Sequence, residues 1–235
     1  MCGIVGAIAR NNVVPVLLEG LLKLEYRGYD SAGMAVADGN GLQRLRTTKR
    51  VSELMKLADI EGTAGSVGIA HTRWATHGVP CERNAHPHFS GKERKIAIVH
   101  NGIIENNDVI RQRLQKKGFE FLSDTDTEVI AHLISEYLEQ TDDLLEAVCL
   151  AVSQLQGAYA IVVVEEKRPD RIIAARKGAP LLLGLSDNGN YAASDASALL
   201  QVTRRMIYLE EGDVAELASD NYRILNCVKD ILGKI

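Results

Sequence analysis

The chain has 235 residues, of which 46% are hydrophobic and 25% charged, and this composition is typical of a globular protein with one large domain or two small ones. Its formal net charge of −4 argues against nucleic-acid binding, and no apolar run approaches the about 20 residues that cross a bilayer. No positively charged segment precedes the short N-terminal apolar run, so we expect no signal peptide. The cysteines are far apart in sequence, which favours free thiols in a reducing cytoplasm over a disulfide framework or a zinc site: Cys2, Cys81, Cys149 and Cys227.

The chain opens with Cys2, followed by an apolar run over 3–9 that predicts a buried strand. If Met1 is removed, Cys2 carries both a thiol and a free α-amine. The α-amine has a pKa of about 7.7–8.0, so one residue could supply a nucleophile and its general base. The alternative is that Cys2 is only a small residue that opens a buried strand.

A helix is expected from Pro15 to residue 24, because apolar residues recur there at helical spacing. Residues 25–33 contain two glycines, an aspartate and a serine, and predict a loop in which Arg27 stands between two tyrosines. The elements expected next are a hairpin formed by 34–36 and 42–45, a short helix over 51–58 and a strand over 66–70.

The segment 71–88 holds four of the six histidines and the only tryptophan, and it shows no helical or alternating pattern. We therefore predict a long ordered loop, of the kind that often binds ligands. The spacing of His86, His88 and Cys81 matches no common zinc pattern, so we expect neither a metal nor another cofactor.

Residues 95–100 predict a buried strand, and Asn101-Gly102 follows it directly. This dipeptide usually forms a hairpin turn, but here a helix ending near 117 follows, so we do not expect a hairpin. A short strand is predicted over 119–122. Thr125 and Glu128 have the spacing of a capping box that opens a helix over 129–139, and the helix dipole alone would explain Asp126 in the first turn.

A further helix is expected over 143–154, and the remainder of the chain is rich in strands. We predict an α+β fold in which two mostly antiparallel sheets pack together with helices on their outer faces. We assign 2–218 to one domain and 219–235 to a tail. The strands expected in the second half are 158–164, 171–175, 181–185, 191–193, 206–209 and 213–217, with a helix at 196–201.

A cysteine nucleophile needs a carbonyl to attack and donors for the oxyanion that forms. Asn101 and the Gly102 N–H could provide those donors. Arg73 could hold a carboxylate bidentately, and Asp126 could hold an ammonium. A substrate with an α-carboxylate, an α-ammonium and a reactive side-chain carbonyl would fit, and glutamine and asparagine have these features.

Six motifs, in this order, make the chain resemble the class II glutamine amidotransferase domain of the N-terminal-nucleophile hydrolases over residues 2–218. They are CGIVG (2–6), EYRGYDSAG (25–33), HTRWATHG (71–78), NAHPH (84–88), HNGIIEN (100–106) and TDTE (125–128). The resemblance implies a four-layer αββα sandwich and hydrolysis of glutamine through a γ-glutamyl thioester, which releases glutamate and ammonia.

The resemblance also implies a role for each matching residue. Cys2 would be the nucleophile, and Asn101 with the Gly102 N–H would form the oxyanion hole. Arg73 would bind the α-carboxylate of glutamine and Asp126 its α-ammonium. The other implied residues are Thr76 and His77, which would line the pocket, Trp74 on a mobile loop that closes over it, and Arg27, which would support the surroundings of the nucleophile.

In the most similar members of the family, sugar isomerase domains bind fructose 6-phosphate and use the ammonia. This chain shows no such segment, so we expect a glutaminase module whose acceptor site lies elsewhere, in a possible homodimer. Three alternatives stay open: a glutamine-binding regulatory module without catalysis, an interaction domain, and a subunit that serves another acceptor.

Overall fold

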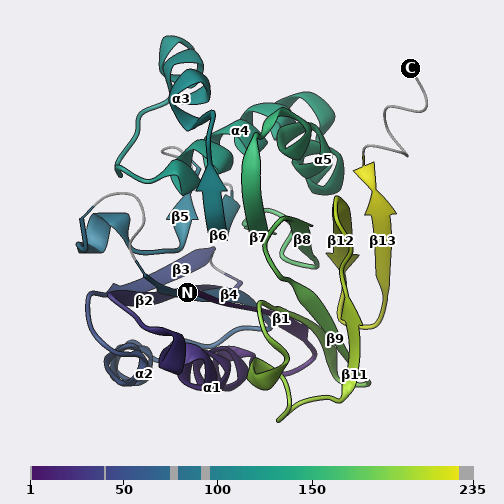
Figure 1. The fold of residues 1–235 in the computed structure, drawn as a ribbon. Coiled ribbons are helices and arrows are strands. Elements are labelled where there is room, and N and C mark those ends of the chain that lie inside the picture. Colours follow the sequence, from purple (N-terminus) through teal and green to yellow (C-terminus); the bar gives the residue numbers. More distant parts are fainter. Residues whose placement is uncertain (1, 40, 75–78, 91–95, 228–235) are drawn as a thin grey trace.

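The computed structural model describes residues 2–39, 41–74, 79–90 and 96–227, and these fold into four layers. Two β-sheets lie against each other at the centre, and helices cover both outer faces (Figure 1). All pairings between the named strands are antiparallel. The α+β sandwich expected from the sequence is therefore confirmed.

The first sheet has seven strands in the order β11-β9-β10-β1-β4-β2-β3, with β1 at its centre. Helices α1 (Val14–Leu24) and α2 (Val51–Ile60) cover its outer face. The strands are β1 (Gly3–Ala9), β2 (Ser31–Ala37), β3 (Leu42–Thr47), β4 (Val67–Arg73), β9 (Leu182–Ser186), β10 (Gly189–Ala193) and β11 (Arg205–Tyr208).

The second sheet has six strands in the order β13-β12-β8-β7-β6-β5. Its outer face packs against α3 (Asn107–Lys116), α4 (Asp126–Thr141) and α5 (Leu144–Gln154). The strands are β5 (His88–Phe89), β6 (Ile96–Ile104), β7 (Gly157–Glu165), β8 (Ile172–Lys177), β12 (Asp213–Leu217) and β13 (Tyr222–Asn226). Three short 3₁₀ turns complete the described elements: η1 (Glu25–Arg27), η2 (Glu82–Asn84) and η3 (Ala196–Ala198).

Three apolar clusters fill the spaces between the four layers. Strand β1 shows how the sequence produces this arrangement. Its Ile4 and Ile8 point into the cluster between the two sheets, whereas Val5 and Ala7 point into the cluster under α1 and α2. A strand buried on both faces reads as a continuous apolar run, which is the pattern that predicted it.

Several local predictions are wrong. Residues 119–122 form no strand, because Phe119 and Phe121 pack instead against the ring of His132 on α4. The strand β4 continues through Arg73, and β6 continues through Asn101 and Gly102, so these residues do not lie in loops. In place of the helix at 196–201, the structure has the 3₁₀ turn η3.

The capping box before α4 is also wrong in detail. Thr125 is the N-cap residue, but its side chain makes no capping hydrogen bond. Its hydroxyl lies 2.9 Å from the Ser123 hydroxyl and 3.1 Å from Nε2 of His88. The Glu128 carboxylate turns back and accepts the N–H groups of Leu122 and Ser123 at 2.8 and 2.7 Å. Helix α4 therefore begins at Asp126, three residues before the predicted start at 129, and a network other than the capping box fixes that point.

The C-terminal residues join the fold more closely than the sequence indicated. Strand β13 lies within the expected tail and pairs with β12. The sulfurs of Cys149 on α5 and Cys227 after β13 form a disulfide that links Cα atoms 5.6 Å apart. The expectation that both are free thiols is therefore wrong, because 78 residues of sequence separate two positions that the fold makes neighbours. Among the described helices, none is long and apolar enough to cross a membrane.

Candidate active site

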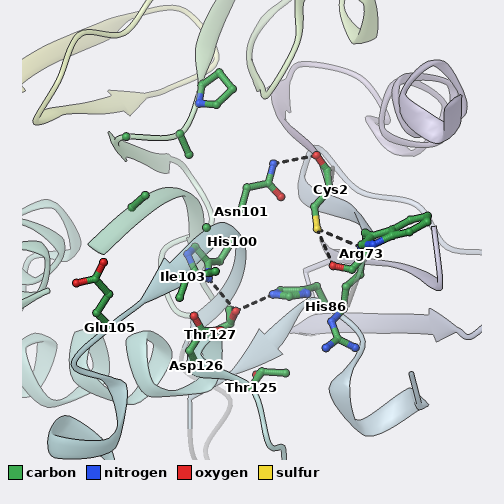
Figure 2. A pocket seen from close by; sticks show the side chains of 16 residues that line it. Cys2, Arg73, His86, His100, Asn101, Ile103, Glu105, Thr125, Asp126 and Thr127 are labelled. Atoms are coloured by element: carbon green, nitrogen blue, oxygen red, sulfur yellow. Dashed lines mark hydrogen bonds between the residues drawn. The ribbon is translucent and has the colours of Figure 1, made fainter. Parts of the chain in front are cut away.

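A cavity of about 740 Å³ opens where β1 and β4 of the first sheet meet β6 of the second and the first turn of α4 (Figure 2). Its volume lies within the range of small-molecule binding sites. The side chains that line it come from distant parts of the sequence. They are Cys2, Arg73, Trp74, His86, His100, Asn101, Gly102, Ile103, Glu105, Thr125, Asp126, Thr127, Ala158, Gly178, Ala179 and Pro180.

Cys2 is held at the edge of the cavity by the neighbouring strand. Strand β1 pairs with β4, which places Cys2 beside the end of β4. The backbone N–H of Trp74 donates to Sγ of Cys2 at 3.1 Å, and the thiol donates to the Trp74 carbonyl at 3.5 Å (Figure 2). Burial raises the pKa of the Cys2 thiol, and it outweighs the opposite effect of the Trp74 N–H. The thiol is therefore protonated at neutral pH, and a base must remove its proton before it can attack.

Asn101 and Gly102 approach Cys2 from the second sheet. The Asn101 side-chain Nδ2 donates to the backbone carbonyl of Cys2 at 3.1 Å, so the amide nitrogen faces the nucleophile (Figure 2). Gly102 has a φ of +138°, and a Cβ at this position would lie 2.0 Å from the Ala158 carbonyl oxygen. Only glycine lets β6 pass this close to β7 at the cavity wall.

Two oppositely charged side chains are buried in the cavity wall. Arg73 is 4% exposed, and its Nη1 lies 3.8 Å from an oxygen of Asp30. Asp126 is 5% exposed, and its Oδ2 accepts the Ile104 N–H at 2.9 Å. The carboxylate of Asp126 therefore joins α4 to β6 and also faces the cavity, so its structural and binding roles are compatible.

The remaining predicted residues are placed only in part. Thr76 and His77 lie outside the described residues, and for Arg27 the structure describes the backbone, in η1, but not the side chain. Trp74 is 54% exposed and packs on the loop after Arg27, since a Cβ at Gly28 would lie 2.2 Å from the indole ring. The segment that joins η1 to β2 is thus in direct contact with the residue that follows β4. Of the loop predicted at 25–33, residues 25–27 form η1 and residues 31–33 belong to β2.

Sequence reasoning missed a second group of cavity residues. No site role was predicted for His86 or His100, yet both face the cavity and share the Thr127 hydroxyl, at 2.9 and 3.0 Å (Figure 2). The hydrogen bonds of His86 and His88 go to threonine hydroxyls, and the described residues contain no group of three or more side chains placed to hold a metal. Residues 178–180 also line the cavity, but they have no polar or reactive side chain by which the sequence could have identified them as site residues.

The arrangement combines a thiol, an amide donor beside it, a buried cation and a buried anion around one cavity. These are the functional groups that a thiol hydrolase needs to act on a zwitterionic amino acid. The chain belongs to the family described as the glutamine amidotransferase domain, whose profile matches residues 71–201.

Curated relatives agree with this assignment. The chain is 55% identical over 225 residues to the glutamine–fructose-6-phosphate aminotransferase (isomerizing) of Pseudomonas syringae pv. tomato, an alignment that covers 95% of this chain and 36% of the relative. The enzyme of the same name from Escherichia coli is 53% identical over 227 residues, with 96% and 37% covered. The chain thus spans about a third of the length of these relatives.

Solved structures show the same fold. The glutamine phosphoribosylpyrophosphate amidotransferase from B. subtilis superimposes with a TM-score of 0.82 at 26% identity, over 96% of this chain and 49% of that one. A structure described as the allosteric regulatory enzyme of purine biosynthesis gives a TM-score of 0.83 at 26% identity, with the same coverage. The four-layer sandwich is therefore shared with amidotransferases.

Proposed function

We propose that this chain hydrolyses the side-chain amide of glutamine, with Cys2 as the nucleophile. The observation that carries the proposal is the meeting, in one cavity, of Cys2, the Asn101 amide, the Arg73 guanidinium and the Asp126 carboxylate. Membership of the amidotransferase family supports the same chemistry.

Two charged groups would hold the backbone end of glutamine. A buried guanidinium binds a carboxylate bidentately and strongly because water does not compete for it, which suits Arg73 and the α-carboxylate. One oxygen of Asp126 accepts a backbone N–H, and the carboxylate can also accept from an α-ammonium. With both charged groups of the backbone end fixed, the side-chain amide extends towards Cys2.

The reaction then follows in two halves. The free α-amine of Cys2, exposed by removal of Met1, takes the thiol proton, and Sγ attacks the side-chain carbonyl carbon of glutamine. The Asn101 Nδ2 and the Gly102 N–H stabilise the oxyanion. The ammonium of Cys2 returns the proton to the leaving nitrogen, so ammonia departs and a γ-glutamyl thioester remains. Water cleaves this thioester, which gives glutamate and restores the thiol.

The binding roles can be tested with two truncated ligands. The amide of 4-aminobutanoate lacks the α-carboxylate of glutamine, and glutaramate lacks its α-ammonium. Arg73→Lys should weaken competitive inhibition by glutaramate about 10- to 100-fold but leave inhibition by 4-aminobutanamide nearly unchanged, because charge-assisted hydrogen bonds contribute about 1.5–3 kcal/mol. Asp126→Asn should show the opposite pattern. If each variant weakens both ligands equally, the assignment of the two anchors is wrong.

The catalytic role is tested by glutamate and ammonia release. The wild-type chain without Met1 should release both in equal amounts, whereas Cys2→Ala should release neither and still bind glutamine. Glutamine binding without turnover by the wild type would favour a regulatory module instead.

We further propose that residues 2–218, with β13 added to their second sheet, form the glutaminase domain and that its ammonia serves fructose 6-phosphate bound by sugar isomerase domains. The name and length of the curated relatives support this acceptor. A different acceptor remains the second candidate, and hexosamine formation by the full-length protein distinguishes the two. A cytoplasmic location and a homodimer complete the proposal. The Cys149–Cys227 disulfide is unusual in a reducing compartment, so thiol counting on freshly purified protein tests the first, and sedimentation tests the second.

A further inference from the structure

We propose that His71 is a positioning residue for the oxyanion hole: it fixes the orientation of the Asn101 amide so that the amide nitrogen points at Cys2. The inference rests on the proposed glutaminase function. His71 lies on β4, opposite Ile4 of β1, and is 1% exposed. It does not line the cavity, so it acts on the reaction through its neighbours, and Asn101 is the neighbour whose side chain contacts Cys2.

The surroundings of the His71 ring define which nitrogen carries its proton. Nε2 lies 2.9 Å from Oδ1 of Asn101 and 3.0 Å from the backbone carbonyl oxygen of His100. Both neighbours are acceptors, so Nε2 must be the donor. Burial lowers the pKa of His71 to about 3, so the ring is neutral at physiological pH. Nδ1 is buried and has no hydrogen-bond partner in the described part of the chain, as expected of the unprotonated nitrogen.

The His71 proton determines which way the Asn101 amide faces. When Oδ1 accepts from His71, Nδ2 must lie on the opposite side of the amide, where it donates to the Cys2 carbonyl at 3.1 Å. Its second proton remains for the oxyanion. If the amide rotated by half a turn, Oδ1 would face both the Cys2 carbonyl and the developing negative charge, and both contacts would be repulsive.

The His71 ring is itself held in place. Its centroid lies 4.1 Å from that of His86, and Nε2 of His86 lies 2.9 Å from the Thr127 hydroxyl. Thr127 follows Asp126 in the first turn of α4. A continuous set of contacts therefore runs from the turn that carries the proposed ammonium anchor to the amide of the oxyanion hole.

The test is a double-mutant cycle on the full chain without Met1. His71→Leu removes the donor at similar size, and it should lower kcat for glutamine hydrolysis about 10- to 100-fold while KM changes less than about threefold, because the defect arises in the transition state. In an Asn101→Ala background the same change should lower kcat less than about twofold, since the group it orients is absent. His71→Gln, which keeps an N–H donor, should restore most of kcat.

The matched control is His132→Leu, since His132 is also fully buried but lies on α4 against Phe119 and Phe121. It should leave kcat within about twofold. Equal losses from His71→Leu in both backgrounds, or a loss in KM instead of kcat, would overturn the positioning role. If His71→Leu does not fold, His71→Gln decides alone: a kcat loss of more than about tenfold in that variant contradicts the inference. A wild-type chain without glutaminase activity would refute the proposed function and, with it, this inference.

Discussion

Buried neutral histidines should make this protein lose stability as the pH falls below about 7, before its carboxylates begin to titrate. Burial lowers the pKa values of His71 and His88 to about 3 and that of His86 well below its ordinary value. All three side chains are at most 5% exposed. In the unfolded chain each would recover a pKa of about 6.5. As the pH falls below that value, the unfolded state binds protons that the folded state cannot, and the free energy of unfolding decreases.

The size of the effect follows from these pKa values. Between about pH 7.5 and pH 5 these histidines stay neutral in the folded state and become protonated only in the unfolded state. Each therefore lowers the free energy of unfolding by about 2 kcal/mol over this range. His71 and His88 together should remove about 4 kcal/mol, and His86 increases the loss. Single domains have a total stability of about 5–15 kcal/mol, so the loss is a large fraction of it. Most carboxylates remain ionised at pH 5, which isolates the histidine contribution.

Urea unfolding, followed by circular dichroism at intervals between about pH 7.5 and pH 5, measures this loss directly. His71→Gln and His88→Gln should each reduce the decrease by about 2 kcal/mol, whatever their effect at pH 7.5. A stability that is constant across this range, or an unchanged slope in both variants, would refute the assignment of neutral buried histidines.

Three further predictions concern the backbone and the disulfide. Gly102→Ala should lower the free energy of unfolding by about 3 kcal/mol or more, and the melting temperature with it, because its Cβ would lie 2.0 Å from the Ala158 oxygen. Gly118→Ala should cost about 1–2 kcal/mol, because Gly118 has a φ of +90° but no atom lies within 4 Å of the added Cβ. A wild-type melting temperature in both would contradict the geometry. Cys149→Ser should cost about 2–4 kcal/mol in oxidising buffer, since the disulfide closes a separation of 78 residues, and Cys227→Ser should cost the same. Both losses should disappear in excess dithiothreitol, and thiol counting should find two more reactive thiols in the wild type after reduction.

The sequence predicted the layers of the fold better than it predicted where individual strands end. Continuous apolar runs such as that of β1 identify a strand buried on both faces, and strand-rich halves on either side of the central helices predicted the two stacked sheets. It could not show where a strand ends. Asn101 and Gly102 resemble a turn in sequence, but they remain in β6 because Gly102 adopts a φ that lets the strand continue against β7.

The sequence predicted the reactive and charged side chains of the candidate site, but it did not predict the contacts that hold them in place. Cys2, Arg73, Asn101 and Asp126 come from four separate segments, and the motif resemblance grouped them, as the cavity now does. The hydrogen bond of His71 to Asn101 joins two strands of different sheets, and no local pattern encodes it. The disulfide escaped prediction for the same reason, since its partners meet only after β13 joins the sheet.

The central claim is that Cys2, at the start of a chain without Met1, attacks a glutamine side chain. The most direct measurement is mass spectrometry of the protein after reaction with an electrophilic glutamine analogue. We predict an intact mass that lacks Met1, a single adduct on the N-terminal peptide carrying Cys2, and protection by excess glutamine. An adduct on the free thiol of Cys81, an adduct that survives Cys2→Ala, or an active enzyme that retains Met1 would contradict the account.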